Sequence, residues 1–461
     1  MSNLLSTMFI ATGAMAADQG ALEVTANNVA NVNTPGYSRE IPVLQEIAPV
    51  VLGNVTYGTG VTLAKIQSVR DPILQLRIQQ ESGEQGKLNA FVNALDQAQT
   101  LFKSGDGDLA SEMSNLFSSV AQLSTNPADV SLRQAVLTAA SSLTSAFNNL
   151  AKNLSTQRSN LNLNVAESVK EINTLTQQIA ALNGKIGALQ NVGQDASGFI
   201  DQRDNLVAQL SGLIDLSAIK SDSGIALTTS NGTALVTGMQ SYNLSAQDDA
   251  SGVQHVFTQQ GADITSQINS GSLAGLIEAR DQTIPGLLNQ LDTLAAGLET
   301  AFNQANAAGF DLSGNVGGNL FTPPPASLTG AATDMAVAIA DPSLIAASSD
   351  RSAGSNGNLA NFSAIQDQPI ISGATPGTYY ANLVFDVGND VSNNTAELQS
   401  SQLVLQQLQD QRGSISGVSL DEEAAHMVQF QRAYDAAAQV VVAVNQMLET
   451  VINMGTVAVS S

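Results

Sequence analysis

Apolar residues recur at helical spacing at both ends of the chain. Near the start, steps of three and four alternate through Leu5, Met8, Thr12, Met15, Gln19, Leu22, Ala26 and Val29. Near the end, the same steps run through Leu420, Ala424, Met427, Gln431, Tyr434, Ala438, Val441, Asn445, Leu448 and Ile452. Heptad spacing is typical of helices that pack along one another. The pattern therefore predicts two terminal helices that form a coiled coil, with an amphipathic helix on a globular core as the alternative for the first seam alone.

Both terminal helices carry boundary signals. Ser419 and Glu422 have the S-x-x-E spacing of a capping box, in which each residue satisfies a backbone N–H of the other. The acidic residues at 421–423 also complement the positive end of a helix dipole. At the other end of the chain, Pro35 disfavours helix at Thr34, and Pro35-Gly36 suits the centre of a type II turn. The first helix is therefore predicted to end before Pro35.

A long helix is predicted inside the chain. Asn126-Pro127 suits a helix start with Pro at the first helical position, and no further Pro follows until after residue 190. Its seam runs through Leu161, Val165, Ser168, Ile172, Leu175, Ile179, Leu182, Ile186 and Leu189. Such a helix would be roughly 90 Å long, a length typical of a rod. Shorter helices are predicted at 87–103, 108–123, 200–212, 272–307 and 389–412.

Three segments between the helices have a different texture. Residues 213–270 are rich in Gly, Ser, Thr and β-branched residues, with turn signals at Asn231-Gly232 and Asp248-Asp249, and predict a small β domain. Residues 310–385 predict loops with short strands, and residues 37–70 predict extended chain. The expected fold is mainly α with inserted β: terminal helices forming a coiled coil, a long rod-like helical domain and small β-rich outer domains. The expected domains are 1–33 with 420–461; 34–212 with 271–310 and 386–419; 213–270; and 311–385.

Composition and charge exclude several kinds of partner. The 461 residues include 40 acidic and 17 basic side chains, which gives a formal net charge of −23. Phosphate backbones are bound by Lys and Arg, so neither nucleic acid nor an anionic membrane surface is an expected partner. The absence of cysteine excludes disulfides and thiolate chemistry. Copies of such a chain repel one another, and salt would relieve that repulsion.

The beginning of the chain imitates a secretion signal. Residues 4–17 are mostly apolar and small, and Ala14 and Ala16 give an A-x-A pattern. The first basic residue is Arg39, so the positive region that precedes a cleavable signal is missing. We expect no cleaved signal peptide. Apolar runs also fall short of the roughly 20 residues that a membrane span needs.

The search for catalytic or ligand chemistry is negative. The two histidines, His255 and His426, are far apart in sequence, and His426 is expected to flank the terminal seam or face solvent. Residues 311–322 imitate a calcium-binding loop, but Val316 and Thr322 stand where Gly and Glu are required. Helix-start electrostatics explain the acidic run at 421–423. We therefore predict no enzyme, no catalytic residues, no cofactor and no metal site.

Two terminal motifs resemble a known family. Residues 26–39, ANNVANVNTPGYSR, resemble the signature of bacterial flagellar axial proteins of the rod, hook and hook–filament junction. Residues 416–453, SGVSLDEEAAHMVQFQRAYDAAAQVVVAVNQMLETVIN, resemble the partner signature of the same proteins. The segments 200–216 and 271–314, and the SLDEEAA sequence, resemble the hook–filament junction members. The resemblance is weakest across 217–265 and 315–375.

The resemblance implies a structural subunit between hook and filament. It implies export through the flagellar type III channel to the cell exterior, and a ring of about eleven subunits. The hook protein would lie on one side and the second junction protein on the other, and an export chaperone would bind the C-terminal helix over 427–448. The resemblance also implies that the terminal helices are disordered in the monomer and order on assembly. The alternatives are another axial protein, such as the hook protein or the second junction protein, or an exported enzyme on an axial scaffold.

The residues expected to form the assembly interface come from both termini. We predict that the amides of Asn27 and Asn28 bond to neighbouring subunits or to the C-terminal helix, because both residues lie a full turn inside the first helix. The complete predicted set is Leu5, Met8, Met15, Leu22, Asn27, Asn28, Val29, Asn31, Asn33, Pro35, Gly36 and Tyr37 at the N-terminal side, and Leu420, Met427, Tyr434, Val441, Leu448 and Ile452 at the C-terminal side.

Overall fold

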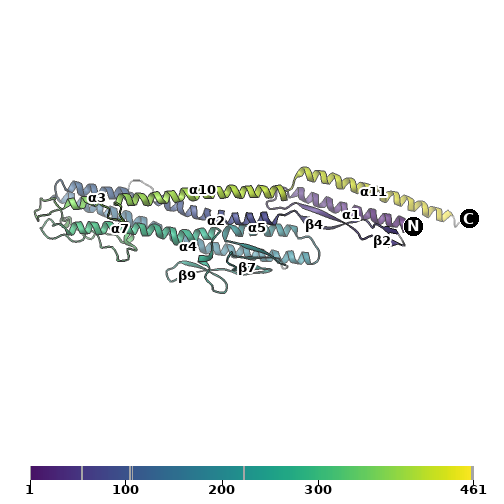
Figure 1. Ribbon diagram of the computed structural model, residues 1–461, viewed down its shortest axis with the longest axis horizontal. Helices are drawn as coiled ribbons and strands as arrows, with labels where there is room; N and C mark the ends of the chain where they lie inside the picture. Colours follow the sequence, from purple (N-terminus) through teal and green to yellow (C-terminus); the bar gives the residue numbers. More distant parts are fainter. Residues whose placement is uncertain (1, 53–54, 103–104, 106, 222–223, 458–461) are drawn as a thin grey trace. The chain divides into compact units, whose positions relative to one another are not determined.

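The protein is built mainly from helices (Figure 1). The computed structural model describes residues 2–52, 55–102, 105, 107–221 and 224–457. The α-helices are α1 (Ser2–Ala30), α2 (Pro72–Leu101), α3 (Leu109–Leu123), α4 (Val130–Asn191), α5 (Ser197–Leu213), α6 (Ser272–Glu278), α7 (Ile284–Ala307), α8 (Ala331–Asp334), α9 (Leu359–Ala364), α10 (Pro376–Ser416) and α11 (Leu420–Val457). Short helical turns are η1 (Thr265–Gln267), η2 (Ala279–Thr283) and η3 (Pro342–Leu344).

The strands form small antiparallel sheets. They are β1 (Glu40–Glu46), β2 (Val50–Leu52), β3 (Val55–Tyr57), β4 (Val61–Ser68), β5 (Ser217–Ser221), β6 (Gly224–Thr228), β7 (Ala234–Thr237), β8 (Gln240–Ser241), β9 (Ser245–Asp248) and β10 (Gln254–Phe257). The pairs are β1–β4, β2–β3 and β9–β10, and β5–β6–β7–β8 form a four-stranded sheet. Helices with small inserted sheets confirm the predicted fold class.

The chain divides into two compact units. The first unit contains Met1–Ser82, Ile172–Asn243 and Gln402–Ser461, and the second contains Gly83–Glu171 and Leu244–Ser401. Helices α2, α4 and α10 have residues in both units. The four-domain division expected from the sequence stays a prediction, and its residues 1 and 458–461 lie outside the described residues.

In the first unit, α1 and α11 pack side by side and antiparallel, so the beginning of α1 and the end of α11 lie at the same end (Figure 1). Strands β1 and β4 also pack on α1. Gly20 allows β4 to lie close to α1, because a Cβ at this position would lie 2.7 Å from the Leu63 side chain. Farther along the unit, Leu74 and Ile78 of α2 pack with Leu405 and Leu408 of α10.

The core of the second unit is centred on aromatic rings of α3, α7 and the segment that follows α7. The Phe302 ring lies 5.7 Å from Phe117, 5.7 Å from Phe321 and 6.0 Å from Phe362, measured between centroids. All four rings are buried. Asn303 fixes the incoming chain, because its amide exchanges two hydrogen bonds with the Phe321 backbone. The buried aromatic rings therefore lie where the segment that follows α7 packs on α3 and α7.

The long internal helix is confirmed as α4, and seven of the nine predicted seam residues are buried. The prediction is wrong at Ser168, which is partly exposed, because Val169 occupies the buried position instead. The predicted start is also wrong, because Pro127 precedes the helix. Asp129 performs the capping instead, and its carboxylate accepts from the Ser131 N–H at 2.7 Å and the Leu132 N–H at 3.3 Å.

Two other helices begin earlier than predicted. Helix α2 begins at Pro72 instead of residue 87, and Asp71 caps it by accepting from the Ile73 N–H at 2.9 Å. Helix α10 begins at Pro376 instead of residue 389. Both starts have Pro in the first turn, where the missing N–H costs nothing. Each Pro is followed by glycines within the first sixteen residues, and these hid the helix until tertiary packing was known.

The remaining predicted helices are confirmed with one local change. The segment 272–307 is helical throughout but passes through the π-helical turn η2, in which the Ile284 N–H bonds to the Ala279 carbonyl. Pro285 explains the wider turn, because it has no N–H to donate and its ring crowds the preceding turn.

The predicted β segment 213–270 contains β5 to β10, and residues 37–70 are extended as expected. Gly232, in the predicted Asn231-Gly232 turn, has φ of 88°. The prediction of short strands within 310–385 is wrong, because this segment forms only isolated bridges among its described residues, such as Phe310–Ser348 and Phe321–Val337. Its backbone bonds mainly to helix side chains and to its own turns, which leaves few donors free for a ladder.

Candidate functional site: the paired terminal helices and their joint

The inward line of α11 keeps a heptad spacing. Its residues are Glu423, Met427, Phe430, Tyr434, Ala437, Val441, Val444 and Leu448, all buried or partly buried. Four of the ten predicted seam residues lie on this line, namely Met427, Tyr434, Val441 and Leu448. At three positions the inward residue is the preceding one, because Ala424, Gln431 and Asn445 are exposed, and in these pairs the apolar or larger residue faces inward. Of the remaining predicted residues, Leu420 and Ile452 are exposed and Ala438 is partly buried.

The buried line of α1 differs more from the prediction. It contains Ala17, Ala21, Val24 and Asn28, whereas Leu5, Thr12, Gln19 and Ala26 of the predicted seam are exposed. Small residues lie inward because α1 is covered on two sides, by α11 and by the β1–β4 pair. The large apolar residues Leu5 and Phe9 face outward, and Phe9 is 74% exposed.

The segment after α1 forms the predicted type II turn. The Tyr37 N–H bonds to the Thr34 carbonyl at 3.2 Å, and Gly36 has φ of 81°. A side chain at Gly36 would be strained by that φ and would also meet Asn205, whose amide lies 2.2 Å from the Cβ position. The turn reverses the chain and brings Tyr37 and Glu40 back to the end of α1.

Asn28 is the centre of a buried hydrogen-bond network. Its amide nitrogen donates to the Glu40 carbonyl at 2.8 Å and to the Glu423 carboxylate at 3.1 Å. Its amide oxygen accepts from the Tyr37 hydroxyl at 2.8 Å and from the Glu40 N–H at 2.9 Å. The side chain is 1% exposed, and these four bonds use all the capacity of its amide group. Asn28 thus links α1, β1 and the first turn of α11.

The neighbouring carboxylates are held in an apolar, acidic environment. Burial and the nearby Asp195 raise the pKa of Glu40, against the hydrogen bond that Asn27 donates to its carboxylate. Burial and the charges of Glu40 and Asp201 also raise the pKa of Tyr37. The phenol is therefore a firm donor to Asn28 at neutral pH. The Asn28 amide satisfies the buried carboxylate of Glu423, and the Tyr37 phenol in turn satisfies the amide oxygen of Asn28.

A second set of contacts fixes the turn to the rest of the first unit. Ser38 donates from its N–H and its hydroxyl to Asp201 of α5, at 3.0 and 2.8 Å. Arg70 also pairs with Asp201 at 2.8 Å, and Arg412 of α10 donates to the Gly36 carbonyl at 2.7 Å. The Arg39 N–H bonds to the Ser416 carbonyl at 2.8 Å. We call residues 27–40 together with Asp201, Arg412, Ser416 and Glu423 the joint.

The capping box at the start of α11 is half formed. The Ser419 hydroxyl accepts from the Glu422 N–H at 3.5 Å. The Glu422 carboxylate instead pairs with Arg39, which lies in the joint. The acidic first turn of α11 therefore serves the joint as well as the helix dipole, which sequence spacing alone could not reveal.

The structure places the predicted interface residues in three classes. Asn28 is buried, and its bond to the C-terminal helix is as predicted, whereas Asn27 bonds to Glu40 and Asn31. Partly exposed residues are Met8, Met15, Leu22, Val29, Asn31, Gly36, Tyr37, Met427, Tyr434, Val441 and Leu448. Exposed residues are Leu5, Asn27, Asn33, Pro35, Leu420 and Ile452. Their role in assembly stays a prediction.

Sequence reasoning missed several residues of the joint. Ser38 and Glu40 continue the terminal motif and could have been included on that ground. Glu423 was interpreted only as a helix-start charge. Asp201 and Arg412 are distant in sequence, and nothing near them indicates that they meet residues 36–38.

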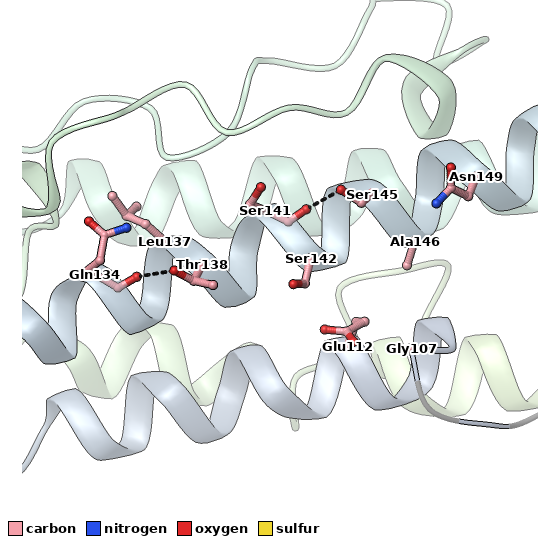
Figure 2. Close-up of a pocket in the computed structure, with 10 residues that line it drawn as sticks. All are labelled: Gly107, Glu112, Gln134, Leu137, Thr138, Ser141, Ser142, Ser145, Ala146 and Asn149. Carbon is pink, nitrogen blue, oxygen red and sulfur yellow. Dashed lines mark hydrogen bonds between the residues drawn. The ribbon is translucent and has the colours of Figure 1, made fainter.

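One surface groove of the second unit is lined mainly by polar side chains. Figure 2 shows a groove of about 470 Å³ between α3 and α4, lined by hydroxyl, amide and small side chains. Glu112 is its only ionisable group among the described residues. The Ser145 and Thr138 hydroxyls bond to backbone carbonyls of α4, at 2.9 Å each, so they are not activated nucleophiles.

The two histidines belong to different units. His426 is exposed on α11 beside Phe430, as expected. His255 bonds to Asp263 at 2.7 Å in the β9–β10 region. Within the described ranges, no three His, Cys, Asp or Glu side chains gather as a metal site. The described helices also include none with the length and apolarity that crossing a membrane requires.

Comparisons with known proteins match these same parts of the chain. The family described as "Flagella basal body rod protein" matches residues 8–37, and "Flagellar basal body rod FlgEFG protein C-terminal" matches residues 411–454. "Flagellar hook-associated protein FlgK helical domain" matches residues 95–321. The two terminal matches cover α1, its turn and most of α11, the elements that the joint connects.

Individual relatives extend over nearly the whole chain. Flagellar hook-associated protein 1 of Bacillus subtilis is 28% identical over 98% of this chain and 99% of its own length. The Escherichia coli protein of the same name is 26% identical over 98% of this chain and 100% of its own. The solved structure of the flagellar hook junction protein FlgK from Burkholderia pseudomallei has a similar fold, with a TM-score of 0.67 over 74% of this chain, 100% of that chain and 18% identity.

The terminal helix pair and its joint coincide with the two matches to flagellar basal body rod families. Over nearly its whole length, the chain is similar to flagellar hook-associated protein 1 of other bacteria, and residues 95–321 match the helical domain of that protein.

Proposed function

We propose that the protein is a structural subunit of the junction between flagellar hook and filament, and that it polymerises through α1 and α11. It reaches the cell exterior through the flagellar type III apparatus without a cleaved signal peptide. It forms a ring of about eleven subunits between the hook protein and the second junction protein. An export chaperone covers α11 before export. The names of the relatives support the hook-associated role, and the exposed surface of the terminal helices supports polymerisation.

The observation that carries this proposal is the small amount of apolar surface that the terminal helices bury in one subunit. Among the α11 residues whose side chains are described, Val444 is the only buried apolar one. Val442, Met447 and Ile452 are all more than half exposed. Burial of apolar area must offset the entropy of ordering a helix. The pair is therefore marginal alone, and neighbouring subunits supply the missing burial.

The outer face of α11 has a form suited to a second helix. A groove of about 510 Å³ is lined by Ala438, Val442, Ala443 and three polar residues, Asp435, Gln439 and Gln446. Small residues permit close helix approach, and polar residues at a helix seam fix register. This face lies opposite the inward line, so another copy can occupy it while α1 remains paired.

The decisive experiment changes the outer face without changing the helix pair. Val442→Asp with Gln446→Glu places charges on two exposed residues that line the groove, and we expect flagella that lack the protein at the hook tip. Gln429→Asp is the control, because it adds a charge to an exposed polar position on another side of α11. Immunogold labelling of hook–filament complexes is the measurement. Normal incorporation of the double variant would refute polymerisation through this face.

Two further tests address the terminal helices as a whole. Deletion of residues 420–461 is expected to abolish incorporation into flagella while the second unit still folds. Limited proteolysis of the monomer is expected to remove both terminal helices before it cleaves residues 130–210. Termini as resistant as that segment would contradict coupled folding and assembly. A peptidoglycan hydrolysis assay tests the enzyme alternative, and clear activity would overturn the structural role.

A further inference from the structure

The first unit contains a cavity of about 390 Å³ beside the joint. Its walls come from α2, α4, α5, α10 and the β5–β6 pair. The apolar part of the lining is Leu74, Leu76, Ile186, Ile200 and Ile225. Cavities of this size, mostly apolar with a few convergent polar groups, are typical of small-molecule sites.

Three arginines line the same cavity, in a chain with only 17 basic residues. Arg203 pairs with Asp204 at 3.1 Å, and Arg70 pairs with Asp201 at 2.8 Å. Arg412 donates to the Gly36 carbonyl at 2.7 Å. In the part of the chain that the structure describes, no carboxylate lies within ion-pairing distance of Arg412. Arg412 therefore has donors and a charge that protein groups leave unmatched.

A second donor at the cavity is also unsatisfied. The Nε of Arg70 is buried and has no hydrogen-bond partner among the described residues. An unmade bond to a buried charged group is costly, so an acceptor in the cavity would gain this donor if the Arg70 guanidinium turned toward it. The remaining acid of the lining, Asp71, is already committed to the first turn of α2, where it accepts from the Ile73 and Leu74 N–H groups.

The charged residues of the lining limit the charge that a ligand can carry. Arg70 and Arg203 are paired with Asp201 and Asp204, and the carboxylate of Asp71 accepts from N–H groups at the start of α2, so Arg412 is the lining cation without a carboxylate partner. A dianionic phosphate would be repelled by these acids. A single carboxylate matches the planar guanidinium donors, and an apolar body matches the aliphatic walls. We propose that this cavity binds a small amphipathic carboxylate.

The probe for this site is 4-phenylbutyrate, with 4-phenylbutyramide as the uncharged control of the same shape. Calorimetric titration of the full-length protein is expected to show one site for the acid at millimolar concentration or below. The amide should bind at least about tenfold more weakly, because it lacks the charge that Arg412 and Arg70 recognise. Equal binding of acid and amide, or no binding of the acid, would overturn the proposal.

Two variants locate the site. Ala218→Phe fills the cavity from β5, whereas Ile219→Phe changes the neighbouring exposed residue that does not line it. Arg412→Gln removes the spare charge, and Arg432→Gln makes the same change on the exposed surface of α11. Binding should be lost in Ala218→Phe and weakened about tenfold or more in Arg412→Gln, with both controls unchanged. Circular dichroism establishes that each variant is folded. Full affinity in both cavity variants would place the ligand elsewhere and refute the assignment.

Discussion

At the scale of single residues, Asn28 is the position on which the terminal helices depend most. Replacing it with Ala leaves the Glu423 carboxylate, the Tyr37 hydroxyl and the Glu40 backbone without their partner. Each orphaned buried group costs about 1–3 kcal/mol. We expect α11 to open more readily, with hydrogen exchange of its amides accelerated at least tenfold while the second unit is unchanged.

Asn33 supplies the matched control for this prediction. It is an exposed asparagine of the same motif. Asn33→Ala should change the free energy of opening of α11, measured by hydrogen exchange, by less than about 0.5 kcal/mol. If both substitutions had the same effect, Asn28 would only help to end the helix.

Glu299 is the residue that makes the second unit sensitive to pH. It is 1% exposed in α7, and burial together with the nearby Asp292 raises its pKa to about 8. A raised pKa means that the folded state holds this proton more firmly than the unfolded state does. Its contribution to stability is therefore complete below about pH 4.5 and is lost as pH rises through about 8.

We expect Glu299→Gln to remove this pH dependence. Urea unfolding at about pH 5 and about pH 8 should show the wild-type protein losing a few kcal/mol relative to the variant, since one pKa unit corresponds to about 1.4 kcal/mol. Glu397→Gln, at an exposed position of α10, is the control and should follow the wild type. Parallel pH profiles for wild type and Glu299→Gln would show that the buried carboxyl is solvated.

At the scale of elements, two glycines have opposite roles in the helices of the second unit. A Cβ at Gly275 of α6 would lie 2.3 Å from the Lys87 carbonyl oxygen of α2, so this contact requires glycine. None of the described atoms lies within 4 Å of the Cβ position at Gly286 of α7. Gly275→Ala should destabilise the protein by about 1–3 kcal/mol, whereas Gly286→Ala should stabilise it by about 0.5–1 kcal/mol. Thermal unfolding tests both, and destabilisation by Gly286→Ala would contradict this account.

At the scale of the whole molecule, charge governs association. Each subunit has a formal net charge of −23, and polymerisation brings such charges together. We expect assembly of the purified protein to be faster at about 300 mM than at about 50 mM NaCl, because the screening length falls from roughly 14 to 6 Å. Light scattering measures the rate. A rate that falls as salt is raised would indicate that ion pairs across the interface outweigh the net repulsion.

The sequence predicted the elements where periodicity is strong and uninterrupted. The seam of α4 is correct at seven of nine positions because large aliphatic residues at helical spacing can bury only one face. In α1 only four of the eight predicted seam residues are partly buried and the other four are exposed, because Ala, Gly, Thr and Met are similar enough that periodicity does not select a single face. Only the position of α11 and of the β1–β4 pair decides which side is covered.

The same division holds for the joint. By itself, the sequence determined the turn at Pro35-Gly36 and the resemblance to flagellar axial proteins, and it offered a bond from Asn28 to the last helix as one of two alternatives. These features depend on local backbone preferences and on short motifs. Tertiary structure alone decided that Ser38 meets Asp201, that Arg412 holds the Gly36 carbonyl, and that Arg39 takes the Glu422 carboxylate. Those partners are more than 150 residues apart in the chain, and a hydrogen bond between distant residues leaves no periodic trace in the sequence.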